Sequence, residues 1–311
     1  MLPIIVYRYV SPVIGRKRES LLMNQTLERT ALEKMAPAGK PLIYRQFLST
    51  RITHWLWAIC LFFLVLSGLQ IFNARPDLYI GQQSGFGFDN AILRFDAADT
   101  ANGPRGYTTI FGKRFDTTGV FGLSGSGDNL EARGFPAWAT IPSYQDLATG
   151  RVIHFFFAWV LVATLLTWLV SSLVNGHLVR DLIPRRKDLR RLGSDLADHL
   201  RLRFHHRREY NVLQKFTYAF VLIILLPLMV LTGLTMSPGV DASFPFLVEI
   251  FGGRQTARTI HFLGMALIVL FFLVHMLMVL ATGPLNALRS IITGRYRTDT
   301  SAPDATAQPG E

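Results

Sequence analysis

The sequence of 311 residues has a single cysteine and comparatively few acidic side chains. With Cys60 alone, the chain cannot form an intrachain disulfide, hold an iron–sulfur cluster by cysteines or attach a haem through a CxxCH motif. Cys60 lies in an apolar run, and we interpret it as a small core residue. Asp and Glu total 21 against 32 Lys and Arg, while 50% of the residues are hydrophobic. This balance favours a membrane protein with basic loops over a nucleic-acid binder.

Four apolar runs are long enough to cross a bilayer core of about 30 Å as helices. None of them contains Asp or Glu. The sequence therefore predicts an all-α membrane protein, a four-helix transmembrane bundle with a large extracytoplasmic insertion between the first two helices. The predicted segments are an N-terminal tail (1–50), four spans (51–72, 151–174, 212–236, 259–282), the insertion (73–150), a basic loop (175–211), a short loop (237–258) and a C-terminal tail (283–311).

Lys and Arg predict the orientation of these spans. The basic loop carries ten of them, whereas the longer insertion carries six. By the positive-inside rule, both termini and the basic loop are cytoplasmic and the insertion lies outside. The insertion is rich in aromatic residues as well as Gly, Asp, Asn and Thr, so we expect it to be ordered.

The beginning of the chain carries no convincing signal peptide. Its first apolar run is too short, and no A-x-A cleavage site follows. Met23 offers a second plausible start, so residues 1–22 could lie upstream of the natural product.

The fourth apolar run contains two histidines, His261 and His275. They are fourteen residues apart, which at 100° per residue is within about 40° of four whole turns, so both share one helix face. Their axial separation of roughly 21 Å places one near each boundary of the hydrocarbon. Ionisable side chains at this depth usually face a partner or cofactor. Two stacked b-type haems, each held by histidines from two helices, would satisfy both rings.

Two further histidines open other spans at matching depths. His54 lies at the cytoplasmic start of the first span, and His154 lies at the outer start of the second. The pattern predicts an outer haem between His154 and His261 and an inner haem between His54 and His275. Gly68, fourteen residues beyond His54, shares its helix face at the depth of the outer haem. There it would let a porphyrin pack closely, or simply let helices pack.

An arginine stands three residues before three of these histidines, at Arg51, Arg151 and Arg258. That spacing places a guanidinium one turn nearer water, where it would suit a haem propionate. The alternative is that these are ordinary snorkelling residues at helix entrances.

The remaining histidines lie in or beside the basic loop. His177, at the inner end of the second span, could compete with His54 for the inner haem or lie near a quinone. Three others sit among arginines and are interpreted as part of a solvated face: His199, His205 and His206.

Several sequence motifs occur together over residues 45–300: RITHW, GRVIHFFFAW, NGHLVRDLIP, YNVLQKFTYAF and H-x13-H. In this combination the chain resembles the prokaryotic cytochrome b561 group, which includes the di-haem membrane subunits of formate dehydrogenase, nickel–iron hydrogenase and thiosulfate reductase. The long insertion and the sequence MSPG after the third span most resemble cytochromes b that accompany periplasmic molybdopterin oxidoreductases.

The resemblance implies a protein of the bacterial inner membrane that carries two haems b. Electrons would pass between an extracytoplasmic partner, the haems and a quinone near the inner haem. In the formate dehydrogenase relatives the quinone pocket uses the start of the third helix, which corresponds here to Asn211 and Gln214. Their amides can bond a quinone carbonyl, but they could equally face lipid headgroups.

Two other classes of function remain open. One is a ferric or superoxide-handling oxidoreductase that acts alone through an exposed outer haem. The other is a transporter or structural membrane protein without haem, whose histidines relay protons. A relay would more naturally mix carboxylates into the spans, and the four apolar runs have none.

Overall fold

The computed structural model describes residues 42–85, 88–125, 129–174 and 212–297, with the single positions 127, 176, 178, 183 and 193. Several predictions therefore lie outside the described residues, namely those for the tail up to residue 41, for nearly all of loop 175–211 and for the end from residue 298. His177 and Asn211 belong to this set.

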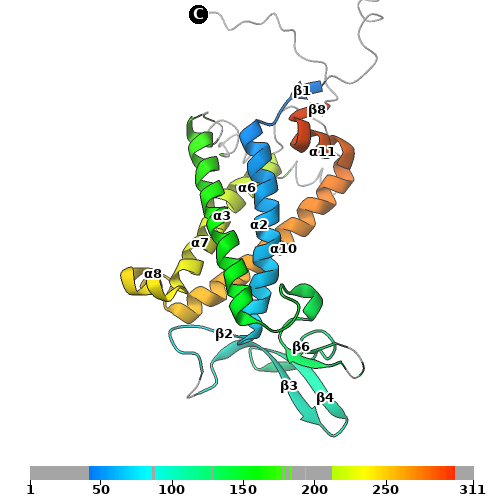
Figure 1. Ribbon diagram of the computed structural model, residues 1–311, viewed down its shortest axis with the longest axis vertical. Helices are drawn as coiled ribbons and strands as arrows, with labels where there is room; N and C mark the ends of the chain where they lie inside the picture. The colour runs from blue at the N-terminus through cyan, green and yellow to red at the C-terminus, as the bar shows by residue number, and fades with distance from the viewer. Residues whose placement is uncertain are drawn as a thin grey trace, which may run out of the picture. The chain divides into compact units, whose positions relative to one another are not determined.

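Four long apolar helices form the transmembrane part, as the sequence predicts (Figure 1). They are α2 (Leu48–Asn73), α3 (Leu147–Val174), a third helix composed of α6 (Val212–Ala219), η3 (Phe220–Leu225) and α7 (Leu226–Thr235), and α10 (Arg254–Thr282). Helix α2 packs along α3, and α7 packs along α10. The bundle is thus assembled from two helix pairs.

The third helix changes its winding just before Pro227. Segment η3 is a π-helix, and the regular α-helix resumes at Leu226. Proline lacks a backbone N–H, and its ring crowds the carbonyl four residues earlier, at Ile223. A wider π turn at this point relieves that crowding. Val221 and Leu225 of this segment are buried against Ile268 of α10.

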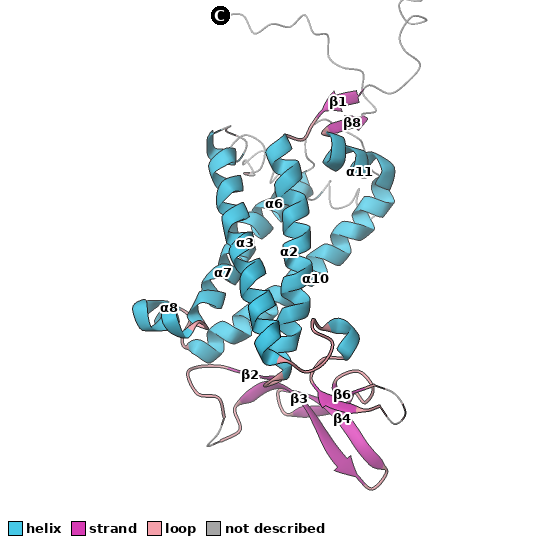
Figure 2. Cartoon of the chain, viewed as in Figure 1, coloured by secondary structure: helices cyan, strands magenta, loops and turns pink. Residues whose placement is uncertain are grey.

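The insertion folds into β-strands, for which the sequence analysis made no prediction (Figure 2). An antiparallel sheet has the strand order β2 (Asp77–Tyr79), β3 (Ala91–Thr100), β4 (Gly103–Ile110) and β5 (Lys113–Asp116). A second, two-stranded sheet pairs β6 (Gly122–Ser124) with β7 (Glu131–Arg133), and a 3-10 turn, η1 (Ala137–Ala139), precedes α3. Tight turns connect β3 to β4 and β4 to β5, whereas a longer loop connects β2 to β3.

Aromatic packing and hydrogen bonds fix the insertion to the helices. Phe72 at the end of α2 packs with Phe95 of β3 and with Phe262 of α10. The Thr259 hydroxyl of α10 donates to the carbonyl of Tyr79 at 2.7 Å. These contacts join strand β2 to the same end of α10 that carries His261.

A buried arginine connects the second sheet to the first helix. The Arg133 side chain is 1% exposed, and it donates to the carbonyls of Phe135 and Ser143 and to the Thr140 hydroxyl. It also lies 3.5 Å from the side-chain oxygen of Gln70 on α2. The guanidinium therefore replaces water as the donor for several carbonyl groups.

Short elements complete the two ends of the bundle. Helices α8 (Pro238–Ser243) and α9 (Phe246–Ile250) connect α7 to α10. At the opposite end, α11 (Pro284–Thr293) follows α10, and strand β8 (Arg295–Arg297) pairs with β1 (Leu42–Tyr44). Arg51 of α2 donates to the carbonyl of Ile292 in α11.

Candidate functional site

The four histidines predicted as a set lie in two pairs inside the bundle. The ring centroids of His154 and His261 are 6.4 Å apart and their planes are inclined by 59°. The centroids of His54 and His275 are also 6.4 Å apart, with an inclination of 54°. We name His154 and His261, on the side of the insertion, the outer pair, and His54 and His275 the inner pair.

Each pair joins two different helices. The outer pair joins α3 to α10, and the inner pair joins α2 to α10. Their common separation is wider than the 4.3 Å between the stacked rings of Phe63 and Phe157 in the same bundle. Among the described residues, no third His, Cys, Asp or Glu joins either pair in a metal-binding group.

The rings of the outer pair each have a hydroxyl beside one nitrogen. Ser67 Oγ on α2 lies 3.1 Å from Nδ1 of His154, and Thr232 Oγ1 on α7 lies 3.0 Å from Nδ1 of His261. Both hydroxyl residues are 0% exposed. In each case the other ring nitrogen, Nε2, is the atom left to bind a ligand.

A glycine follows each of these hydroxyl residues and lies against the same ring. A Cβ at Gly68 would be 3.2 Å from Cε1 of His154, and a Cβ at Gly233 would be 3.5 Å from Cε1 of His261. From the sequence, two roles were open for Gly68, to make room for a porphyrin or to let helices pack. In the structure, the nearest atoms to its Cβ position are those of the His154 imidazole.

These neighbours form an internal repeat that the sequence analysis missed. The sequences VLSGL (65–69) and VLTGL (230–234) carry the hydroxyl and the glycine, while RVIHF (151–155) and RTIHF (258–262) carry the histidine. The helix pair α2–α3 and the helix pair α7–α10 thus present the same set of a hydroxyl residue, a glycine and a histidine. A comparison of the chain with itself would have revealed Ser67, Thr232 and Gly233.

The inner pair has a different surrounding. Within the described part of the chain, Nδ1 of His54 is buried without a hydrogen-bond partner. The His275 ring stacks on Phe271, one turn earlier on α10, with centroids 5.7 Å apart. The indole of Trp55 meets the His54 ring edge to face at 5.5 Å.

The three predicted arginines differ in their contacts. Arg258 is half-buried, donates to the carbonyl of Arg75 and lies over the ring of Phe72 at 5.2 Å. Arg151 is exposed and lies over the ring of Phe155 at 5.6 Å. Arg51 is half-buried and, as described, bonds to α11. A guanidinium has five N–H donors, so each could still bind a carboxylate.

The predicted quinone residues are only partly described. Gln214 is half-buried in α6, at the same end of the bundle as the inner pair. Asn211 and His177 lie outside the described residues, so the structure neither brings them to the inner pair nor separates them from it.

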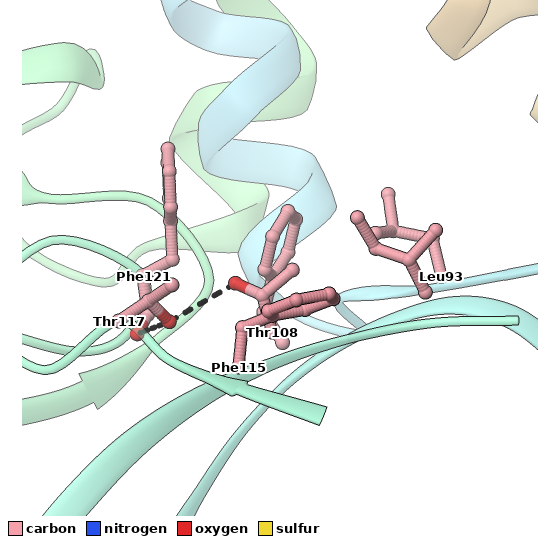
Figure 3. Close-up of a pocket in the computed structure, with 7 residues that line it drawn as sticks. Leu93, Thr108, Phe115, Thr117 and Phe121 are labelled. Atoms are coloured by element: carbon pink, nitrogen blue, oxygen red, sulfur yellow. Dashed lines mark hydrogen bonds between the residues drawn. The ribbon is translucent and has the colours of Figure 1, made fainter. Parts of the chain in front are cut away.

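The insertion contains an open apolar hollow of about 340 Å³ (Figure 3). Its wall includes a hydrogen bond of 3.0 Å between the hydroxyls of Thr108 and Thr117. The lining residues are apolar or carry a hydroxyl: Leu93, Phe95, Thr108, Ile110, Phe115, Thr117 and Phe121. This lining offers no nitrogen, thiol or carboxylate ligand, so the histidine pairs are the candidate cofactor site.

Local hydrogen bonds stabilise carboxylates of the insertion in their charged form. The hydroxyl and then the backbone N–H of Thr118 hold the pKa of Asp116 below its ordinary value. The backbone N–H of Ala91, with help from Arg94, lowers the pKa of Asp89. These groups lie on the sheet, away from the histidines, so they bear on the stability of the insertion.

Comparisons with known proteins agree with a membrane cytochrome. Residues 45–294 match a family model described as prokaryotic cytochrome b561. A curated relative, the putative protein-methionine-sulfoxide reductase subunit YedZ1 of Azospira oryzae, is 27% identical over 231 residues, which cover 74% of this chain and 86% of the relative. No solved structure gives a significant match.

Proposed function

Since the chain belongs to the prokaryotic cytochrome b561 family, we propose that it carries two haems b in series across the membrane. As a member of this family, the protein is a membrane-bound, haem-binding electron-transfer subunit. The number of haems, their ligands and the electron partners are what we propose in addition. The observation that carries the proposal is the presence of two imidazole pairs with the same separation, each between two helices.

The outer pair would hold one haem and the inner pair the other. When bound, each haem would supply a one-electron iron couple, and the two imidazoles of a pair would be its protein ligands. The residues of both pairs suit this role. Nδ1 of each outer ring has a hydroxyl neighbour, which leaves Nε2 available. Gly68 lets the first helix approach the outer pair closely.

Arginines at the helix ends would bind the propionates. Arg258 and Arg151 lie one turn nearer the insertion than the outer pair, and Arg51 lies one turn beyond His54. Carboxylates accept two parallel hydrogen bonds from a guanidinium, which fixes the orientation of a planar group. Arg258 is the best supported of the three, since its half-buried position limits competition by water.

A quinone would exchange electrons with the inner site. Gln214 lies near this end of the bundle, and the Asn211 amide is three residues away in the sequence. An amide N–H can donate to a quinone carbonyl at the edge of the membrane. We expect Gln214→Ala to slow haem reduction by quinol while leaving the haem content unchanged.

The outer site would exchange electrons with a separate extracytoplasmic oxidoreductase, which we propose to be a molybdopterin enzyme. The relative's name describes it as a reductase subunit, which favours a subunit over an oxidoreductase that acts alone. The insertion lies beside the outer pair and exposes large aromatic side chains, with Phe111 77% and Trp138 82% exposed. By the positive-inside rule this side faces the periplasm, and both termini are cytoplasmic in the bacterial inner membrane.

The test is a haem count on the full protein purified in mild detergent, with reduced-minus-oxidised spectra. We expect two low-spin b haems, with one lost in His154→Ala and the other lost in His275→Ala. Trp168→Phe is the matched control, because it alters a buried ring of α3 that packs on Trp57 rather than on a histidine. A protein without haem, or one whose haem survives both histidine variants, would refute the ligand assignment.

The same preparation separates a subunit from an enzyme that acts alone. Rapid reduction of ferric iron or superoxide chemistry without a partner would contradict the subunit proposal. Reoxidation of the reduced haems only after a molybdopterin reductase is added would support it.

A further inference from the structure

We propose that Ser67 and Thr232 are positioning residues of the outer site, which orient both of its imidazoles and lower the reduction potential of that site. The inference rests on the proposed ligation of haem by His154 and His261. It goes beyond that ligation because it assigns a role to two side chains that contact the imidazoles and are not themselves proposed as ligands.

The first step is an account of the hydroxyl protons. Ser67 Oγ donates its proton to the carbonyl of Phe63, and Thr232 Oγ1 donates to the carbonyl of Leu228 at 2.7 Å. A hydroxyl has one proton and two acceptor lone pairs. Since a carbonyl can only accept, each hydroxyl oxygen meets the neighbouring Nδ1 as an acceptor. Nδ1 therefore carries the proton in both outer rings.

The second step is the consequence for the other nitrogen. A neutral imidazole with its proton on Nδ1 has a lone pair on Nε2, which is the form that binds a metal. Both outer rings are thus held in the ligating tautomer before any cofactor arrives. The hydroxyls are 0% exposed, so water does not compete for these bonds.

The third step concerns the orientation of the rings. Each ring is held at Nδ1 by a hydroxyl from the neighbouring helix and faces a glycine at Cε1. The backbone carbonyl of Leu64 is a further hydrogen-bond acceptor for His154, and that of Met229 is one for His261. The hydrogen bond at Nδ1 and the glycine backbone close to Cε1 together restrict rotation of the imidazole about χ2. The repeat supplies the same restraint from α2 and from α7, so both faces of the outer site are preorganised alike.

The inner pair lacks this restraint at His54. As noted, its Nδ1 has no hydrogen-bond partner in the described part of the chain. An acceptor at Nδ1 increases the basicity of a ligating imidazole, which stabilises the oxidised metal. The hydroxyls are therefore expected to lower the reduction potential of the outer site specifically.

The experiment uses Ser67→Ala, Thr232→Val and the double variant of the full protein. We expect both haems to remain and the midpoint potential of the outer haem alone to rise. Each change should alter its reduction equilibrium by up to roughly tenfold, the size of one neutral hydrogen bond. The low-spin EPR signal of the outer haem should shift in the same variants, and Ser67→Thr and Thr232→Ser should retain the parent values.

Thr164→Val is a matched control. Thr164 Oγ1 also donates to a carbonyl one turn earlier, that of Val160, and also accepts from a ring N–H of the neighbouring helix, that of Trp57 at 3.1 Å. It has the same bonding pattern without an imidazole. Its removal should leave both potentials unchanged.

The outcomes separate this inference from the proposed function. Unchanged potentials and EPR signals in folded Ser67→Ala and Thr232→Val proteins with two haems would overturn the positioning role and leave the ligation intact. If Ser67→Ala loses the outer haem, retention by Ser67→Thr supports the hydroxyl role, whereas equal loss in both variants refutes it. Survival of both haems in His154→Ala would instead overturn the ligation itself.

Discussion

The two glycines beside the outer pair allow one substitution to be compared at equivalent positions. Alanine is more favourable than glycine inside a helix by about 1 kcal/mol. At Gly233 the new Cβ would meet His261 at 3.5 Å, an ordinary contact, so Gly233→Ala should raise the free energy of unfolding by up to about 1 kcal/mol. At Gly68 the Cβ would lie 3.2 Å from His154, closer than most Cβ contacts in proteins.

At Gly68 the same gain is opposed by overpacking, which costs roughly 1–3 kcal/mol in a well-packed core. The net effect of Gly68→Ala should therefore be a loss of up to about 2 kcal/mol. The His154 ring must move by a few tenths of an ångström, so we also expect a reduced content of the outer haem in this variant and a normal content in Gly233→Ala.

The assay is thermal unfolding in detergent, followed by helix content and by haem absorbance, together with a haem count. Gly233→Ala should be the most stable, the parent protein should be intermediate, and Gly68→Ala should be the least stable. An equal effect of the two substitutions, in either direction, would show that the clearance around the rings does not decide the outcome.

Three further predictions concern the insertion and its attachment. Arg133→Met removes a buried guanidinium that donates to the carbonyls of Phe135 and Ser143, so it should cost about 2–5 kcal/mol and make the insertion sensitive to protease. Resistance equal to that of the parent protein would contradict this. Thr259→Val removes the bond to the Tyr79 carbonyl and should cost about 1 kcal/mol by thermal unfolding, whereas unchanged stability would mean that the other contacts of strand β2 hold it without this bond. Because the pKa of Asp116 is lowered in the folded protein, this carboxylate contributes to stability above the ordinary carboxyl pKa. That contribution is lost as the pH falls through the pKa of Asp116 in the folded state. The free energy of unfolding measured against pH should therefore fall at the acidic end, and fall less in Asp116→Asn; identical acid profiles would refute this.

The membrane helices follow from the sequence because the bilayer imposes a strong constraint. A run of apolar residues of sufficient length can satisfy its backbone only as a helix, and all four predicted spans are helical. The depth of each histidine follows from its place in a span. For this reason the two pairs deduced from His54, His154, His261 and His275 are the pairs that the structure brings together.

The insertion was harder to anticipate. Its strands contain Gly, Pro, Asp and Thr, and the burial along β3 alternates only weakly. The insertion also contacts a helix that is remote in the sequence, as in the packing of Phe135 on Phe262. The residue pattern of a single sequence predicts neither these strands nor their contacts with the helices.

The hydroxyl residues of the outer site escaped notice for another reason. Ser and Thr within apolar helices commonly bond back to their own carbonyls, as Ser67 and Thr232 do. Only the partner helix shows that each also contacts an imidazole. The arginines are similar, because the partners of Arg51 and Arg258 are backbone carbonyls of distant segments.

The pairing of β1 with β8 brings together two positions at which the chain could be circularly permuted. Leu42 lies opposite Arg297, so the first and last described residues are neighbours. In a variant trimmed to residues 42–297, a short linker would join these two positions, and chains whose ends lie close together tolerate circular permutation. New ends opened in the turn between β3 and β4, beyond Thr100, would then emerge on the far side of the bundle. Such a permutant would keep both histidine pairs while carrying its two termini at the opposite end of the bundle from Leu42 and Arg297.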